Sequence, residues 1–216
     1  MSEDIKMCLG KIASLSIREI GRTEEDVKIR VVVPILECLG HKRTQLDFER
    51  DGIDIFIREG IPADSRVIVE TKRYKVNLEK YVVTLKRQSE RMNALLSVIS
   101  NGAEMRIYFN SYEKEPLCKV SREHLDENES LDILKRFLLR KNLISGLTKT
   151  YVVQEFNRMW EEDIEPKLGV VKRWIEELPH VSEEAHKALL QTGIDNISRF
   201  LDKVEAYLSS YKRLVQ

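Results

Sequence analysis

Two short stretches of the chain decide the fold, and they read Gly52-Ile53-Asp54-Ile55-Phe56-Ile57 and Arg66-Val67-Ile68-Val69-Glu70-Thr71-Lys72. In the first stretch isoleucine returns at every second position, and the second is equally strand-like, so each is predicted to form a β-strand. Residues 59–65, which include Gly60 and Pro62, supply the turn between them. Because this link is short, the two strands are expected to pair as an antiparallel hairpin.

Two helices are predicted before this hairpin. Residues 5–20 form the first, and the second begins at Thr23, whose hydroxyl can cap the exposed amides, with Asp26 three residues later. The second helix runs to about Gly40, and Pro34 inside it should produce a kink. Its apolar residues recur at helical spacing and are Val27, Val31, Ile35 and Leu39.

The chain after the hairpin is predicted to contain one more helix and three more strands before it becomes helical throughout. The helix spans residues 78 to about 96, and the strands lie at about 96–99, 105–110 and 117–120. Beyond residue 120 the helical pattern has breaks at Ser145-Gly146, Pro166, Pro179 and Gly193. The sequence therefore predicts an α/β fold, with a mixed central sheet flanked by helices in residues 1–120. Residues 121–216 are expected to form a helical C-terminal extension packed on that core.

The composition limits which surfaces, cysteine sites and cellular locations are expected for the protein. The formal net charge is zero, so any nucleic-acid-binding surface must be local. The three cysteines, Cys8, Cys38 and Cys118, are far apart and include no C-x-x-C pair, so neither a disulfide framework nor a cysteine zinc site is indicated. No run approaches the roughly 20 apolar residues that span a bilayer, and the N-terminus lacks a secretion signal. We expect a cytoplasmic protein without membrane association.

Asp54, Glu70 and Lys72 are the candidate catalytic residues. Side chains alternate along a strand, so Glu70 and Lys72 project on the same side, and Asp54 can reach that side from the neighbouring strand. Paired carboxylates suit Mg²⁺ or Mn²⁺, which keep several waters and bind phosphate oxygens, and a nearby ammonium can orient an attacking water. These groups meet the requirements of phosphodiester hydrolysis.

The same residues resemble a known family. Gly52-Ile53-Asp54, a short turn and Val69-Glu70-Thr71-Lys72 are similar to the Asp…Glu-x-Lys signature of the PD-(D/E)XK nuclease superfamily. The helix from Thr23-Glu24-Glu25-Asp26 to Leu39-Gly40, and Asn101-Gly102 followed by Arg106-Ile107-Tyr108, resemble the N-terminal nuclease domain of type I restriction-enzyme motor (R) subunits. The resemblance covers roughly residues 15–145. It implies a restriction-endonuclease-like fold and metal-dependent cleavage of DNA, as in restriction or defence.

The resemblance also implies a role for each matching residue. Asp54 and Glu70 would bind the metal, with the backbone carbonyl of Thr71 as a further ligand, and Lys72 would be the catalytic lysine. Glu24 would be the helix carboxylate that reaches a metal-bound water, and it is preferred over Glu25 because it stands ten residues before Pro34. Gln88 matches the glutamine of the following helix, although Met92 replaces the tyrosine often found four residues later.

A basic run follows the signature. Residues 66–91 hold eight basic side chains against three glutamates, an excess of five positive charges. Such a patch can neutralise the DNA backbone and release counterions. We expect the nucleic-acid contacts to come from Arg73, Lys75, Lys80, Lys86, Arg87 and Arg91.

Plainer interpretations of these residues stay open. Glu70 and Lys72 could form an ordinary exposed strand face, Glu24 could be favoured by the helix dipole alone, and the basic run could be a solvated helix face. Two functional alternatives follow: a catalytically silent nucleic-acid-binding or interaction module with the same fold, and a nuclease acting on RNA. The chain has no G-x-x-x-x-G-K-[S/T] loop, so a helicase or motor, like a specificity subunit, would be a separate partner. A homodimer is the other assembly considered.

Overall fold

The computed structural model of the chain describes residues 2–109 and 116–166. Its α/β architecture agrees with the class predicted from the sequence. The chain divides into two compact units, and the first contains the sheet and continues to Val152. The expected division at residue 120, and the packing of residues 121–216 on the core, stay predictions. Pro179 and Gly193, where helix breaks were expected, lie outside the described residues.

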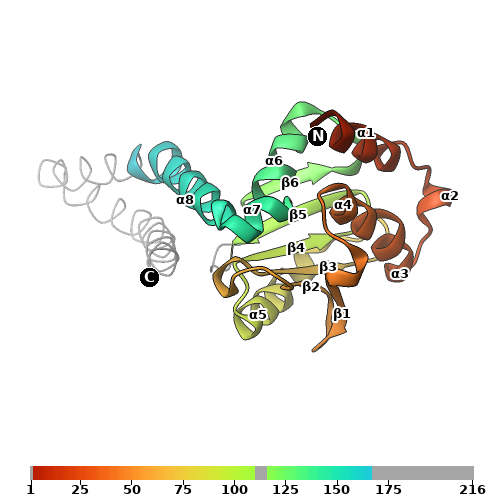
Figure 1. The fold of residues 1–216 in the computed structure, drawn as a ribbon, viewed down its shortest axis with the longest axis horizontal. Helices are drawn as coiled ribbons and strands as arrows, with labels where there is room; N and C mark the ends of the chain where they lie inside the picture. The colour runs from red at the N-terminus through yellow and green to blue at the C-terminus, as the bar shows by residue number, and fades with distance from the viewer. Residues whose placement is uncertain (1, 110–115, 167–216) are drawn as a thin grey trace, which may run out of the picture. The chain divides into compact units, whose positions relative to one another are not determined.

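The described residues form one six-stranded mixed sheet with the strands in chain order (Figure 1). The parallel pair is β3 with β4, and the other neighbours are antiparallel. The β2–β3 hairpin predicted from the sequence is confirmed. The strands are β1 (Leu46–Arg50), β2 (Ile53–Ile57), β3 (Val67–Thr71), β4 (Leu96–Ser100), β5 (Glu104–Phe109) and β6 (Cys118–Ser121).

Strand β1 is the main feature of the sheet that the sequence reading missed. It pairs with β2 through the turn Asp51-Gly52, in which both residues have positive φ angles, 53° and 75°. An Asp-Gly pair in this conformation is typical of a two-residue β-hairpin, because its twist matches that of the strands. The first hairpin of the sheet is therefore β1–β2, and β2–β3 follows it.

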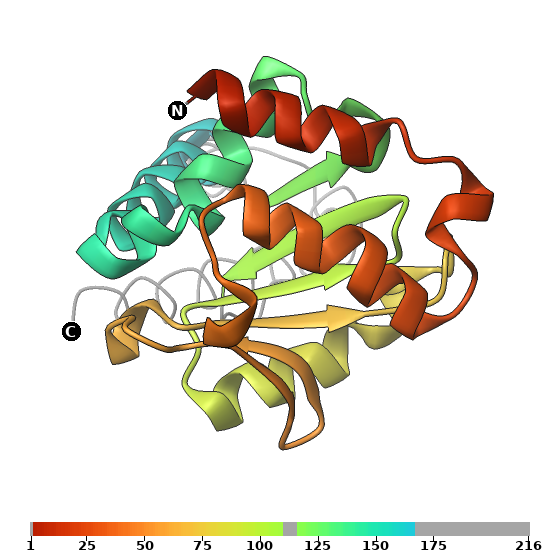
Figure 2. The same ribbon diagram turned by 45° about the vertical axis from the view of Figure 1, so that its right-hand side comes forward.

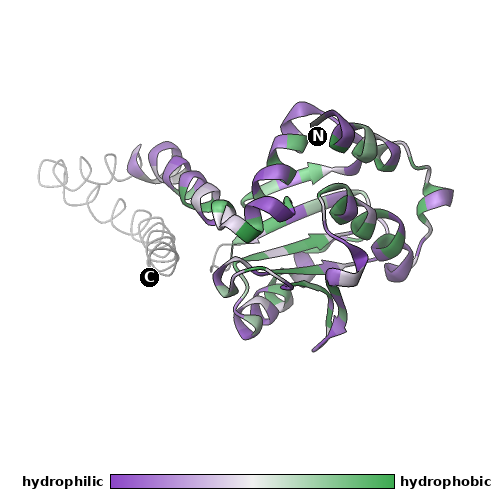
Figure 3. Cartoon of the chain, viewed as in Figure 1, coloured by the Kyte–Doolittle hydropathy of each residue, from purple (hydrophilic) through white to green (hydrophobic). Residues whose placement is uncertain are grey.

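Both faces of the central strands are buried, and the strands are hydrophobic along most of their length (Figure 3). On one face Phe56, Ile68, Ile99 and Tyr108 form a core with the apolar side of α5 (Val82–Met92), which follows a 3-10 helix at Leu78–Tyr81. The opposite face is covered by the N-terminal helices (Figure 2). Glu70 shares the α5 face with Ile68 because side chains two residues apart project the same way.

The N-terminal helices are α1 (Ser2–Ala13), α2 (Ile17–Ile20), α3 (Glu24–Val27) and α4 (Val33–Cys38). The predicted first helix is thus divided, since Ser16 caps a new helix at α2. The cap at Thr23 is confirmed: its hydroxyl accepts from the Asp26 N–H, and the Asp26 carboxylate accepts from the Thr23 N–H. A π-helix, Lys28–Val32, joins α3 to α4 directly before Pro34. Proline has no N–H and its ring crowds the preceding helical turn, and the wider π-helical turn leaves room for that ring.

The helices after the sheet are α6 (Asn128–Leu138), α7 (Arg140–Ser145) and α8 (Leu147–Met159), followed by a π-helix at Trp160–Ile164. The predicted break at Gly146 is confirmed, because this glycine ends α7 with a positive φ of 74°. His41 joins the end of α4 to α6 through a contact of 2.8 Å between its Nε2 and the Leu138 carbonyl oxygen. Helices α6 and α7 therefore belong to the compact unit that contains the sheet.

The cysteines correct one expectation. Cys8 and Cys38 form a disulfide that joins α1 to α4, although the spacing of the three cysteines indicates no disulfide framework. Their separation of 30 residues hides the pairing, because it depends on α1 packing beside α4 with the two Cα atoms 5.8 Å apart. Cys118 takes no part in this bond. Within the described residues, no helix has the length and apolar character needed to cross a membrane.

Candidate functional site

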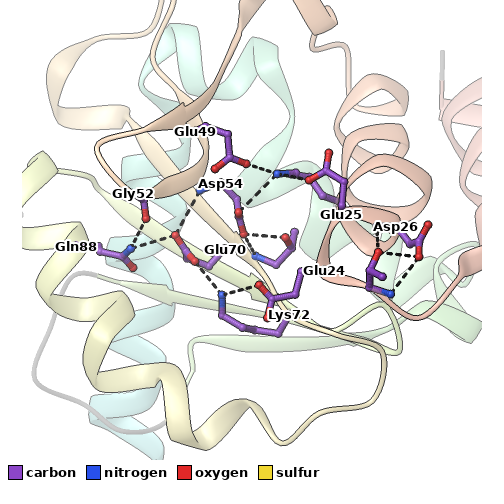
Figure 4. Close-up of polar contacts among 12 residues, drawn as sticks. Glu24, Glu25, Asp26, Glu49, Gly52, Asp54, Glu70, Lys72 and Gln88 are labelled. Atoms are coloured by element: carbon purple, nitrogen blue, oxygen red, sulfur yellow. Dashed lines mark hydrogen bonds and ion pairs between the residues drawn. The ribbon is translucent and has the colours of Figure 1, made fainter.

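Asp54 and Glu70 lie beside one another on the adjacent strands β2 and β3 (Figure 4). The Asp54 backbone N–H donates to Glu70 Oε1 over 3.4 Å. Asp54 Oδ2 accepts two hydrogen bonds from Thr71, one from its N–H at 2.6 Å and one from its hydroxyl at 2.7 Å. These bonds fix the Asp54 carboxylate and leave Oδ1 as the oxygen that faces the ionic groups nearby.

Glu70 is 7% exposed, which is unusual for a carboxylate. Burial, and secondarily the nearby charge of Asp54, raises the pKa of Glu70 despite the opposing effect of Lys72. The ionised side chain is therefore held at a cost in free energy, and a cation placed between Asp54 and Glu70 would relieve it. Perturbed carboxylates of this kind are common at functional sites.

Lys72 directly follows β3, and its side chain lies beside Glu70. Its Nζ atom lies 3.1 Å from Glu70 Oε2 and 3.8 Å from Glu24 Oε2, and it stands 5.3 Å from the centre of the Tyr81 ring. Burial would lower the pKa of Lys72, but the carboxylates outweigh this effect and the pKa is raised. Lys72 is thus a charged lysine at neutral pH, held next to the candidate metal ligands.

Gln88 reaches the site from α5. Its Nε2 donates to the Gly52 carbonyl at 2.8 Å and to Glu70 Oε1 at 3.2 Å. The side chain therefore ties the β1–β2 turn to Glu70. The structure brings together the five residues selected from the sequence, namely Glu24, Asp54, Glu70, Lys72 and Gln88 (Figure 4).

Lys28 is a site residue that the sequence reading missed. Its side chain is buried, and its Nζ lies 2.7 Å from Glu25 Oε2, in contact with Glu49 Oε1, and 3.7 Å from Asp54 Oδ1. Burial would lower the pKa of Lys28, but these carboxylates raise it. A signal was present in the sequence, because Lys28 is three residues after Glu25, the spacing at which opposite charges meet on one helix.

The carboxylates of Asp54 and Glu70 suit a cation that keeps part of its hydration shell when bound. Among residues 2–109 and 116–166, no group of three or more His, Cys, Asp or Glu side chains is arranged to hold a metal ion. The pair Asp54 and Glu70 offers Asp54 Oδ1 and Glu70 Oε1, two hard oxygen ligands. Mg²⁺ is commonly held by one or two carboxylates together with water and substrate phosphate, so this pair fits it. The Thr71 carbonyl as a further ligand stays a prediction.

The basic residues selected as DNA contacts lie along one segment, from the end of β3 to the end of α5. All are exposed except Lys86, which is half-buried. Arg91 also donates to the Asp51 carbonyl in the β1–β2 turn, so it supports the hairpin that carries Asp54. The six residues are Arg73, Lys75, Lys80, Lys86, Arg87 and Arg91.

Comparison of the chain with protein-family models, with curated proteins and with solved structures gave no match.

Proposed function

We propose that this protein is a Mg²⁺-dependent deoxyribonuclease with a restriction-endonuclease-like fold of the PD-(D/E)XK type. The observation that carries the proposal is the contact of Lys72 with Glu70 at 3.1 Å. Glu70 lies beside Asp54 and also accepts a hydrogen bond from Gln88. An acid pair next to a partly buried ammonium provides a ligand set and a positively charged group for one phosphate. The α/β architecture, a mixed sheet flanked by helices, is compatible with such a fold and supports the proposal.

Each residue of the site would have a separate role in phosphodiester hydrolysis. Asp54 and Glu70 would hold the metal ion, which when bound supplies positive charge to the phosphate oxygens and makes an attacking water more acidic. Lys72 would orient that water and stabilise the negative charge that develops on the phosphate. Glu24, 3.8 Å from Lys72 Nζ, would hold the same water from the helix side. Thr71 and Gln88 would keep the two carboxylates in position.

The test is cleavage of plasmid, linear duplex and single-stranded DNA, with RNA of the same sequence, in Mg²⁺, in Mn²⁺ and in EDTA. We expect metal-dependent cleavage of DNA, abolished in Asp54→Asn. Asp47→Asn, a partly buried carboxylate on β1 paired with Arg58, is the matched control and should cleave normally. Cleavage of RNA alone would replace the DNA assignment by the RNA one.

The silent binding module is the second candidate, and one observation favours it. Lys28 contacts Asp54 and Lys72 contacts Glu70, so each of the two candidate metal ligands has a cationic partner without a metal ion. A protein of this type would bind DNA and leave every substrate intact in Mg²⁺ and in Mn²⁺. Binding measured beside cleavage separates the two candidates.

The setting and partners belong to the same proposal. A motor or helicase subunit, a specificity subunit or a second copy of the chain would bring the nuclease to its target. A cytoplasmic location requires that the fold survives reduction of the Cys8–Cys38 disulfide, because cytosolic thiols are kept reduced. Thermal unfolding with and without dithiothreitol measures this directly.

A further inference from the structure

Lys28 is surrounded by carboxylates in the way a metal ion would be. Its side chain is 6% exposed, and three carboxylate oxygens, from Glu25, Glu49 and Asp54, lie within 3.7 Å of its Nζ. The three acids come from different parts of the chain: the helix, β1 and β2. The ammonium is therefore the common partner of groups that would otherwise repel one another.

The pairing of β1 with β2 explains why a cation is needed there. Phe48 is opposite Ile55 and Arg50 is opposite Ile53, so Glu49 and Asp54 stand between the same two residue pairs of the hairpin. Like charges at opposite positions of an antiparallel pair destabilise the sheet. Lys28 contacts both of these carboxylates and so offsets the repulsion.

Asp54 presents its two oxygens to different partners. Oδ2 is held by Thr71, while Oδ1 faces Lys28 at 3.7 Å. In phosphodiester-cleaving sites with two metal ions, the ions stand roughly 3.5–4 Å apart and act on both sides of the scissile phosphate. Because Oδ2 is held by Thr71, a second ion would have to share Oδ1 with the first, and the Lys28 ammonium already lies 3.7 Å from that oxygen.

The charge balance leads to the same conclusion. Glu25, Glu49 and Asp54 carry three formal negative charges, and Lys28 cancels one of them. The Glu70 and Lys72 pair is neutral in itself, and Glu24 adds one negative charge beside Lys72. One divalent ion at Asp54 would cancel what remains around Lys28, whereas a second ion would meet a fixed positive charge.

We propose that Lys28 occupies the second cation position of the Asp54 carboxylate, so that the site takes a single divalent ion. This inference rests on the proposed metal-dependent function. Lys28 is in this view a positioning residue that acts through Asp54, and Lys72 is the lysine that faces substrate.

The test counts Mn²⁺ ions bound to the full 216-residue chain by calorimetry and by electron paramagnetic resonance, without DNA. Wild type and Lys28→Arg, which keeps the charge, should each bind one ion. Lys28→Met should bind two, and its first ion should bind about tenfold more tightly, since unit charges near 4 Å interact strongly in a protein interior. Lys11→Met, an exposed lysine on α1, is the matched control and should bind one ion.

The outcomes separate this inference from the proposed function. One ion with unchanged affinity in Lys28→Met, or two ions in wild type, would overturn the role of Lys28 and leave the nuclease proposal standing. No ion in wild type would overturn both. Thermal unfolding identifies a variant that does not fold, and Lys28→Gln, which keeps a donor for Glu49, then takes the place of Lys28→Met with the same expected count.

Discussion

Lys28 and Lys72 stand on two sides of the same carboxylate pair, but they are held differently. Lys72 has one short contact, 3.1 Å to the buried Glu70, and one longer contact to Glu24. Lys28 has short contacts to Glu25 and Glu49, two exposed acids that enclose it from the solvent side, and a longer contact to Asp54. Lys72 can turn toward an incoming phosphate by giving up one strong partner, whereas Lys28 would have to give up two. The comparison indicates that one lysine serves substrate and the other serves the site itself.

Removal of Lys72 should have the largest effect. Lys72→Ala is expected to reduce the cleavage rate by about 10² to 10³ at saturating Mg²⁺, because a positioned charge at the reacting phosphate is lost. DNA affinity should change little, since Lys72 is one of eight basic residues in residues 66–91. Cleavage rate and affinity are measured side by side, with Lys80→Ala as control. Cleavage by Lys72→Ala at the wild-type rate would mean that this lysine is structural.

Acid should weaken the framework through His41, away from both lysines. Burial lowers the pKa of His41 to about 4, so the folded chain binds a proton on this residue less readily than the unfolded chain, whose histidine has its ordinary value near 6.5. The stabilisation is complete above pH 6.5 and is lost as the pH falls toward 4, by about 3 kcal/mol. Raised carboxyl pKa values, as at Glu70, act in the opposite direction.

Urea unfolding between pH 7 and pH 4 measures this loss. His41→Gln keeps a donor for the Leu138 carbonyl but does not titrate, so its stability should vary less with pH. His124→Gln, an exposed histidine, is the control. If wild type and His41→Gln lose stability in parallel, His41 is not the group responsible.

Thr71 tests whether the orientation of Asp54 matters as much as its charge. Thr71→Val removes the hydroxyl bond to Asp54 Oδ2 and keeps the shape and the N–H bond. Residues that orient metal ligands typically contribute 10- to 100-fold in metal affinity, so Mn²⁺ should bind about tenfold more weakly. Thr148→Val removes the hydroxyl of another fully buried threonine and should leave Mn²⁺ affinity unchanged. Unchanged Mn²⁺ affinity in Thr71→Val as well would argue against Asp54 as a ligand.

Charge reversal on α5 should weaken DNA binding without affecting the metal site. In the variant Lys86→Glu with Arg87→Glu, DNA of every sequence should bind about tenfold more weakly, and the salt dependence should become shallower by roughly 0.9 for each phosphate that is no longer neutralised. Lys11→Glu with Arg18→Glu, on α1 and α2, is the control. Equal salt slopes for wild type and the α5 variant would place the DNA surface elsewhere.

The part of the site that could be predicted from the sequence is the part fixed by local geometry. Glu70 and Lys72 are two residues apart in a stretch with a strand pattern, so strand alternation suffices to select them. Gln88 is predicted from the resemblance, because it matches the glutamine of the following helix. Lys28 and Glu49 required knowledge of which strand lies beside β2. The sequence signal for that strand is the Asp51-Gly52 pair, which is typical of a two-residue hairpin turn. The Cys8–Cys38 pairing depends on how two helices pack, which no spacing rule encodes.

Glu49 has a further consequence, for how copies of the chain behave toward one another. Among the described strands, β1 is an edge strand, with backbone groups available for pairing on one side. Glu49 has a φ of 53°, a conformation that interrupts the regular pattern of N–H and C=O groups along that edge, and it carries a charge there. An extended segment of another molecule would meet a bent and charged edge instead of a straight ladder. The residue that gives Lys28 a partner thereby also protects the sheet against growth by strand addition and aggregation.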